Sequence, residues 1–489
     1  MVENPDQFKE ITEAIASNFE WLLVSENGRT FPLNNTEIEV NTGNGSLRFG
    51  YTDDKGFHLR RITGFKEKEG EIEIELMGFA KTKAETLRLI PRTAAAELSL
   101  EIELARLRKA NEIASAVEAA MPGQKLTRVA LDKKRGRFAK MILKGRSGSQ
   151  TIVVADVTGT MTHESLTSTA LLQLAKLRVR KKDPIKDITI AAEKTSARNL
   201  RKLHALLPDS GLSVVELKEE KGERSARFLA PVHLSDLWRE RPPKLNIPSE
   251  LIISRTASQL ISIAPEKIDV VFSKQGETLR FLGLPFARVR KVFDRERAWF
   301  GIGRKQAMLM PENFSQVVGL IAELALYRSS NADTKKHQYY KAYQEAWLGS
   351  ILRRNISLLD ANLVLSPLYN QFRASRDKID LLAIRSDGRL VIIELKTSPD
   401  RDLIFQAADY WRKIELQRRR GVLTKARLFG DREIIDKPAL IYTVAPALCF
   451  HRDDPFFAKK LIPDIEIWRF YLHENWRKEI KVIQRQQFE

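Results

Sequence analysis

The sequence predicts a multidomain protein that combines α+β and α/β architecture. Three observations support this class: the chain has 489 residues, period-two alternation dominates its N-terminal part, and strand-like and helix-like segments alternate farther on. A chain of this length can hold roughly three or four compact units. We divide it into a β-rich domain (1–92), a connecting helix (93–122), an α/β module (123–222), a mixed linker and β region (223–310) and a C-terminal domain (311–489).

The N-terminal domain is predicted to be a small β-barrel or sandwich. Alternating apolar and polar residues, typical of half-buried strands with glycine turns between them, occur at 37–40, 46–51, 58–62 and 72–76. The run from Thr93 to Met121 then predicts one helix, which Pro122 and Gly123 end. Its apolar residues spread around the helix, and this favours a buried connector over the coiled coil of a homodimer.

Strand-like and helical segments alternate between residues 125 and 220. The strand-like segments are 138–143, 151–157, 188–192 and 212–217, and the helical ones are 163–177 and 197–207. This order predicts an α/β module. Farther on, 238–245 has the composition of a linker, 252–299 mixes a short helix with strands, and 311–355 supplies two helices.

The last third of the chain contains an apolar hairpin with acidic residues at its open end. Two runs of Leu, Ile and Val flank the turn residues Ser386–Gly388. A three-residue loop places Asp380 opposite Glu394, whereas a two-residue loop places it opposite Leu395. Gly388 suits the left-handed position that a three-residue loop requires, so we predict the first register.

The predicted pair of carboxylates indicates a metal site. Two carboxylates side by side on one sheet face repel each other unless they share a cation. Mg²⁺ or Mn²⁺ resolves this conflict, with Asp380, Glu394 and the backbone carbonyl of Leu395 as oxygen ligands. Lys396 projects from the same face as Glu394, because side chains alternate along a strand. Its ammonium group could orient a metal-bound water and stabilise developing negative charge.

These residues resemble a known family. Asp380 with Glu394-Leu395-Lys396 is similar to the PD-(D/E)XK nuclease signature, and Gln406 with Tyr410 is similar to the Gln-x-x-x-Tyr motif of its RecB-like branch. The resemblance implies a restriction-endonuclease-like αβββαβ core in the last third of the chain. It also implies that Gln406 and Tyr410 brace the catalytic residues or contact the DNA backbone.

Two further segments bear on this resemblance. Glu345 matches the glutamate that many such nucleases carry on their first core helix, which implies a second metal position. Ile379 departs from the signature, because the PD motif has proline at the position before the aspartate. The order of elements in the central module is similar to the same core, but its second strand, Val153–Val157, has no Glu-x-Lys. An inactive nuclease-like module and a generic α/β domain both explain that pattern.

Each assignment has a simpler alternative. Asp380, Glu394 and Lys396 could form an ordinary ion-pair patch on a solvated sheet face. Against this, apolar residues occupy both faces of the second strand, which indicates a buried strand with charges at its end. Glu345 could be a partly solvated helix residue, and Tyr410 could be a core aromatic.

Composition indicates a polyanionic partner. Lys and Arg number 82 against 63 Asp and Glu, a net charge of +19, which favours nucleic acid. We expect no membrane segment, because no stretch approaches ~18 uncharged apolar residues and the first residues do not form a signal peptide. A basic run after the candidate catalytic strand predicts a DNA-binding rim, although such runs are often only solvated surface. The rim comprises Arg412, Lys413, Arg418, Arg419 and Arg420.

Other classes of site are disfavoured. Cys449 is the only cysteine, which excludes intramolecular disulfides and cysteine-based zinc sites and fits a cytoplasmic protein. No phosphate-binding loop of the Gly-x-x-x-x-Gly-Lys type occurs, so we expect no ATP site in this chain. The sequence therefore predicts a Mg²⁺-dependent nuclease that acts on DNA, in repair, recombination or defence, with RNA as an open alternative. A non-catalytic nucleic-acid-binding or structural subunit that retains the fold is the main rival.

Overall fold

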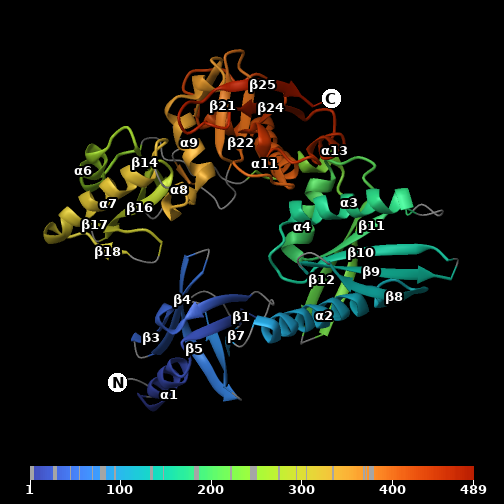
Figure 1. Cartoon of the computed structure of the whole chain (residues 1–489). Coiled ribbons are helices and arrows are strands. Elements are labelled where there is room, and N and C mark those ends of the chain that lie inside the picture. The colour runs from blue at the N-terminus through green and yellow to red at the C-terminus, as the bar shows by residue number, and fades with distance from the viewer. Residues whose placement is uncertain are drawn as a thin grey trace. The chain divides into compact units, whose positions relative to one another are not determined.

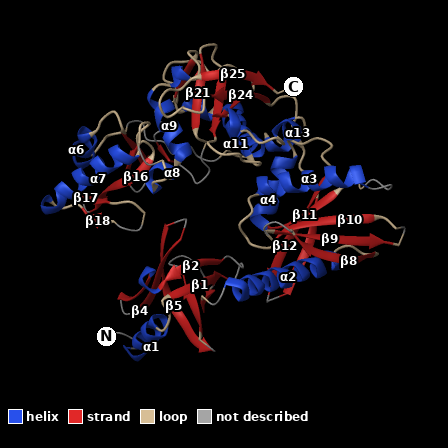
Figure 2. Cartoon of the chain, in the orientation of Figure 1, coloured by secondary structure: helices blue, strands red, loops and turns tan. Residues whose placement is uncertain are grey.

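The computed structural model divides into two compact units, the first comprising 1–200 with 211–230 and the second 201–210 with 231–489 (Figure 1). Figure 2 shows that both units combine helices with sheets, as expected of a multidomain α+β protein. The structure describes residues 5–25, 30–43, 46–53, 56–68, 70–77, 84–92, 95–132, 136–146, 148–180, 185, 187–220, 223–242, 251–273, 276–292, 295–303, 306–332, 335–366, 369–370, 372–373 and 379–488.

The N-terminal domain is a half-barrel formed by one seven-stranded antiparallel sheet around a helix. Trp21, Phe49 and Ile74 of the sheet are fully buried together with Ile11 of the helix. The strand order is β2-β1-β7-β6-β5-β4-β3, so the described strands form a single open sheet. The structure thus refines the barrel-or-sandwich prediction, because one sheet curls over α1 and neither closes nor pairs with a second sheet. The elements are α1 (Pro5–Ala16), β1 (Glu20–Ser25), β2 (Thr30–Asn34), β3 (Ile38–Gly43), β4 (Ser46–Asp53), β5 (Gly56–Lys68), β6 (Glu71–Met77) and β7 (Glu85–Pro91).

The first unit continues as a mixed six-stranded sheet with helices on both faces. Figure 1 shows α2 on one face and α3 and α4 on the other. Ala110 and Ile113 of α2 pack on the first face, and Leu166 of α3 and Leu200 of α4 pack on the second. The strand order is β13-β12-β11-β10-β9-β8. Its elements are α2 (Ala95–Ala119), β8 (Gln124–Leu131), β9 (Phe138–Gly145), β10 (Gln150–Asp156), α3 (His163–Arg180), β11 (Ile188–Glu193), α4 (Lys194–His204), β12 (Leu212–Glu220) and β13 (Glu223–Leu229).

The second unit begins with a mainly antiparallel sheet against which two helices pack. Phe281, Phe286 and Phe300 form its core with Leu260 of α6 and Leu324 of α7. The strand order is β18-β17-β16-β15-β14-β20, in which β20 joins from a later part of the chain. The elements are α5 (Leu234–Leu237), α6 (Arg255–Ile263), β14 (Ile268–Ser273), β15 (Gly276–Phe281), β16 (Leu284–Val292), β17 (Arg295–Phe300), β18 (Ala307–Met308), α7 (Phe314–Tyr327), α8 (Gln338–Lys341) and β20 (Phe372–Arg373).

The C-terminal sheet carries the residues of the candidate site. Trp347 and Leu348 of α9 pack on one face, and α11 contacts β22 and β23. Helix, three strands, helix, strand is the order of the core elements, as expected from the sequence. The strand order is β19-β21-β22-β23-β24-β25. The elements are α9 (Gln344–Arg354), β19 (Leu363–Leu365), β21 (Leu381–Arg385), β22 (Leu390–Leu395), α11 (Leu403–Arg419), α12 (Val422–Lys425), β23 (Leu440–Pro446), α13 (Asp454–Ala458), β24 (Glu466–Leu472) and β25 (Val482–Gln487).

The sheet of β8 to β13 in the first unit and the C-terminal sheet, which contains β19 and β21 to β25, have the same topology. In each, the first three strands pair antiparallel, the next two pairings are parallel and the last is antiparallel. Their central hairpins also have the same turn. Gly145 N–H donates to Ser149 O in one, and Arg385 N–H donates to Arg389 O in the other. The structure therefore contains an internal repeat of this module.

Among the described residues, no helix is both long enough and apolar enough to span a lipid bilayer.

Candidate active site

The hairpin of β21 and β22 has the register that the sequence predicts. Leu381 pairs with Ile393 and Leu382 with Ile392, and one more step places Asp380 opposite Glu394. Gly388 closes the loop with φ 84°, a conformation that side chains with a Cβ rarely adopt. The three-residue loop and its left-handed glycine are confirmed.

The backbone of β22 holds Asp380 next to the end of the strand. Asp380 Oδ2 accepts a hydrogen bond of 2.9 Å from the Leu395 N–H. Leu395 is the last residue of β22, and its side chain is buried in the core. Its carbonyl stays a predicted metal ligand.

Glu394 and Lys396 are charged residues in an interior position. They are 4% and 8% exposed, and Lys396 Nζ lies 3.5 Å from Glu394 Oε1. Glu394 Oε2 is buried and has no hydrogen-bond partner among the described residues. A buried carboxylate oxygen without a partner costs about 1–3 kcal/mol or more. The simple solvated ion-pair patch is therefore not what the structure shows.

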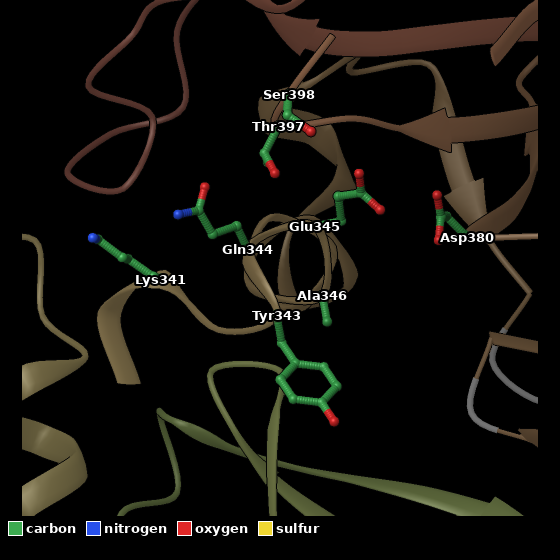
Figure 3. Close-up of a pocket in the computed structure, with 8 residues that line it drawn as sticks. All are labelled: Lys341, Tyr343, Gln344, Glu345, Ala346, Asp380, Thr397 and Ser398. Atoms are coloured by element: carbon green, nitrogen blue, oxygen red, sulfur yellow. The ribbon is translucent and has the colours of Figure 1, made fainter. Parts of the chain in front are cut away.

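Glu345 joins these residues from the first turn of α9. It accepts a hydrogen bond from the Thr397 N–H, and both Asp380 and Lys396 influence its ionisation. Glu345 and Asp380 line a pocket of about 460 Å³ (Figure 3). The remaining lining residues are Lys341, Tyr343, Gln344, Ala346, Thr397 and Ser398. The structure thus brings together Glu345, Asp380, Glu394 and Lys396 from three separate segments of the sequence.

Burial and mutual repulsion shift the ionisation of this cluster. Burial and the neighbouring Asp380 raise the pKa of Glu394 well above its ordinary value. Burial also raises the pKa of Glu345. Burial alone would lower the pKa of Lys396, but the surrounding carboxylates outweigh it and raise that pKa above the ordinary value. Lys396 therefore keeps its proton, while Glu394 resists ionisation unless a further cation compensates it.

The donor set fits a divalent cation. Unpartnered Glu394 Oε2 and the nearby Asp380 supply hard oxygen atoms, and Mg²⁺ usually binds one or two carboxylates together with water and substrate phosphate. Oxygens of Glu345, Asp380 and Glu394 do not converge closely enough for one ion to contact all three. The metal and the division of its ligands between the Asp380–Glu394 pair and Glu345 stay a prediction.

Two charged neighbours of the site were not foreseen from the sequence. Asp400 Oδ2 lies 3.0 Å from Lys396 Nζ, closer than the Glu394 oxygen does. Arg353 of α9 is buried, which lowers its pKa, and it lies close enough to Asp269 and Asp380 for these carboxylates to oppose that effect. Asp400 follows its lysine by four residues in a loop, so strand periodicity gives no signal for this contact. Arg353 belongs to the same helix as Glu345, two turns farther along, and could have been found from that spacing.

Gln406 and Tyr410 lie one turn apart on α11. Gln406 Oε1 is buried and has no hydrogen-bond partner in the described part of the chain, so this oxygen is an acceptor left unused there. Lys413 Nζ lies 5.6 Å from the centre of the Tyr410 ring, a cation–π contact. Neither residue lines the pocket beside Asp380. Their predicted role at the catalytic residues stays a prediction.

Most of the predicted basic rim is occupied by intramolecular ion pairs. Arg412 Nη2 lies 2.6 Å from Asp409 Oδ1, and Lys413 Nζ lies 2.8 Å from Asp409 Oδ2. Arg418 and Arg419 both bind the fully buried Glu415. These partners were not foreseen, because a run of basic letters does not show which of them face the interior. Their pairing argues against these four residues as phosphate ligands, whereas Arg420 is exposed and forms no ion pair with any described residue.

The repeated module of the first unit has different residues at the equivalent positions. Counting from the shared turn, Lys140 stands where the second unit has Asp380, and Val154 stands where it has Glu394. Asp156 stands in the place of Lys396, and its carboxylate accepts hydrogen bonds from Thr158 and from the Met161 N–H. An acidic pair with a neighbouring lysine is therefore absent from these three described positions, as the sequence indicated.

Comparison with known proteins adds little to this geometry. No protein-family description matches the chain, and no curated protein matches it. A solved structure described as "Structure of EndoMS in apo form" is 12% identical, and the match covers 45% of this chain and 96% of that one with a TM-score of 0.18. At this identity and TM-score the likeness carries no argument about fold or function.

Proposed function

We propose that this protein is a metal-dependent nuclease that hydrolyses phosphodiester bonds in DNA. The observation that supports this best is Glu394, a buried carboxylate with one unpartnered oxygen beside Asp380 and Lys396. A carboxylate in that environment destabilises the fold unless a cation compensates it. The PD-(D/E)XK resemblance gives that cation a role in phosphodiester hydrolysis.

The residues of the chain have distinct roles in this proposal. Asp380 and Glu394 would hold Mg²⁺ or Mn²⁺, which when bound polarises the phosphate and lowers the pKa of a water ligand. Lys396 remains protonated between Glu394 and Asp400, so it can orient a water molecule and stabilise the charge that develops on the phosphate. Glu345 stands across the pocket, where it would complete a second metal position or accept the proton of the attacking water.

A second basic surface replaces most of the predicted rim as the proposed DNA contact. This surface lies on β16 and β17, where Arg288 stands directly opposite Trp299 and Arg290 directly opposite Arg297 in the strand register. Like charges placed directly opposite each other destabilise a sheet. The three arginines are exposed and form no ion pair with any described residue. An unneutralised arginine face with an adjacent tryptophan suits a phosphate backbone.

A protein that binds nucleic acid without cleaving it is the rival function. Such a protein needs the arginine face but has no use for the buried carboxylate and its neighbouring lysine. Cleavage assays with linear, circular and branched DNA, in Mg²⁺ and in EDTA, separate the two functions.

The decisive variant is Asp380→Asn. Asparagine keeps an oxygen that can accept from the Leu395 N–H, so it removes the charge with little effect on the hairpin. We expect cleavage to be lost while DNA affinity stays the same or increases, because one negative charge near the phosphate is removed. Asp464→Ala, which removes an exposed carboxylate from a loop, is the matched control. Equal cleavage by Asp380→Asn and wild type would remove Asp380 from the mechanism.

A further inference from the structure

Tyr343 has an unusual combination of backbone strain and exposure. Its backbone is left-handed, with φ 51° and ψ 46°, which is rare for a bulky residue. Its side chain is 58% exposed, so burial of the ring does not explain the strain. Tyr343 lines the pocket that also contains Glu345 and Asp380, with its ring on the opposite side from Gln344 in Figure 3. Strain of this kind persists only where the surroundings enforce it.

Arg328 enforces this conformation. It is fully buried, and its guanidinium donates five hydrogen bonds to four backbone carbonyls. Tyr343 O accepts one of them at 3.0 Å and Ala342 O another at 2.7 Å. Leu282 O, in the turn between β15 and β16, accepts from Nε and Nη2. The antiparallel sheet is thereby tied to the residues that begin α9.

The turn between β15 and β16 packs directly against the first turn of α9. A Cβ at Gly283 would lie 2.2 Å from Ala346 O, so no other residue fits there without displacement of the helix. Together with Arg328, this contact fixes the backbone on both sides of Tyr343 and Gln344. The backbone that carries the exposed ring is therefore fixed before any ligand binds, and this reduces the entropy lost on binding.

Three kinds of side chain line the pocket that Tyr343 borders. Lys341 is exposed and forms no ion pair with any described residue, so it offers a free cation. Gln344, Thr397 and Ser398 offer hydrogen-bond donors and acceptors. A pocket of about 460 Å³ is in the range of small-ligand sites. An aromatic ring, a cation and amide and hydroxyl groups are the chemistry that recognises a nucleotide.

We propose that this pocket receives an unpaired nucleotide of the DNA substrate, whose base stacks on Tyr343 while Lys341 contacts a phosphate. The inference rests on the proposed nuclease function and names its substrate class, which is single-stranded or locally unpaired DNA. A base inside an intact duplex is already stacked and paired, so it must leave the helix before it can reach the ring. Unpaired nucleotides avoid that cost.

The test uses Asp380→Asn protein, which we expect to bind DNA without cutting it, and oligonucleotides with 2-aminopurine at one unpaired or one paired position. Fluorescence reports stacking of the probe, and titration gives the Kd. Tyr343→Gly removes the ring and suits the left-handed backbone, so thermal melting should show no loss of stability. Tyr343→Phe keeps the ring. Phe57→Ala, which removes a ring that is 56% exposed in the N-terminal domain, is the control.

We expect Tyr343→Gly to raise the Kd for the unpaired substrate by a factor of roughly 5 to 150, the range that corresponds to loss of one base–aromatic stack. Tyr343→Phe should restore wild-type binding, and duplex binding should not change. Equal Kd values for Tyr343→Gly and its parent on the unpaired substrate would overturn the pocket assignment, while Asp380-dependent cleavage would still support the nuclease. The converse result, Tyr343-dependent binding without cleavage by the wild-type protein, would overturn the nuclease function and support the pocket.

Discussion

Replacement of Glu394 by Gln should stabilise the metal-free protein while it abolishes cleavage. Glu394 is 4% exposed, and no residue that the structure describes forms a hydrogen bond with its Oε2 atom. Gln removes the buried charge and its repulsion from Asp380 with little change in volume. Lys396 would keep a carboxylate partner, because Asp400 lies 3.0 Å from its Nζ atom.

The size of the effect follows from these contacts. An unsatisfied buried acceptor costs about 1–3 kcal/mol, and part of this cost remains because the amide of Gln also needs partners. We therefore expect a net gain of about 1–2 kcal/mol in the free energy of unfolding. For a unit of 150–250 residues, that gain raises Tm by roughly 2–8 °C.

The gain should depend on pH. The pKa of Glu394 is raised in the folded state, mainly by burial, so folded protein retains a proton that unfolded protein has released. Stability of the wild type is then fully present below the unfolded pKa and falls as pH rises through the folded pKa. The difference between variant and wild type should be small near pH 4 and should widen toward pH 8.

Thermal melting in EDTA at pH 4 and pH 8 measures this difference. Added Mg²⁺ should raise the Tm of the wild type at pH 8 and should leave that of the variant almost unchanged, because only a folded protein with an intact site binds the ion. Glu479→Gln, a change in an exposed glutamate, should alter neither Tm. A variant that melts below the wild type at pH 8 in EDTA would show that Glu394 is a stabilising ion-pair residue, and the argument for a metal site would fail.

Two further predictions concern the basic residues. Arg418→Gln should lower the free energy of unfolding by about 1.5–3 kcal/mol, because fully buried Glu415 loses two charge-assisted hydrogen bonds. Arg420→Gln, the control, should have little effect. Equal urea midpoints for the two variants would show that the buried Arg418–Glu415 pair contributes nothing to stability. Combined replacement of Arg288, Arg290 and Arg297 by Gln should weaken DNA binding and reduce the slope of log K against log salt by up to ~3, at ~0.9 for each lost phosphate contact. An unchanged slope in a binding titration would place the DNA elsewhere.

The geometry of the hairpin could be predicted because its determinants are local. Strand alternation and the single glycine at position 388 fix which residues face each other, and Asp380, Glu394 and Lys396 follow from that register. Glu345 could be assigned from helical periodicity and a resemblance, although its contact with Thr397 depends on tertiary packing.

Other features depend on information that a linear pattern does not carry. Asp400 reaches Lys396 through the path of a loop, and Arg418 points at Glu415 because one face of α11 is buried. The sequence of a basic run does not show whether its side chains face solvent or a buried carboxylate. Tyr343 gave no signal at all, since its left-handed backbone results from hydrogen bonds that Arg328 makes to carbonyls distant in sequence.

The internal repeat provides the strongest argument that the acidic cluster is functional. The two sheets have the same topology and the same turn in the central hairpin. A comparison of them therefore shows which residue types the fold accepts at the position of Glu394. In the first unit the equivalent residue is Val154, which is fully buried and has only an apolar side chain. The fold therefore does not need a carboxylate there. In the second unit, Glu394 occupies the same place at a cost in stability, beside Asp380 and a lysine that two carboxylates hold. A group that the architecture does not require and that is costly to bury supports the proposed metal-binding role of Glu394.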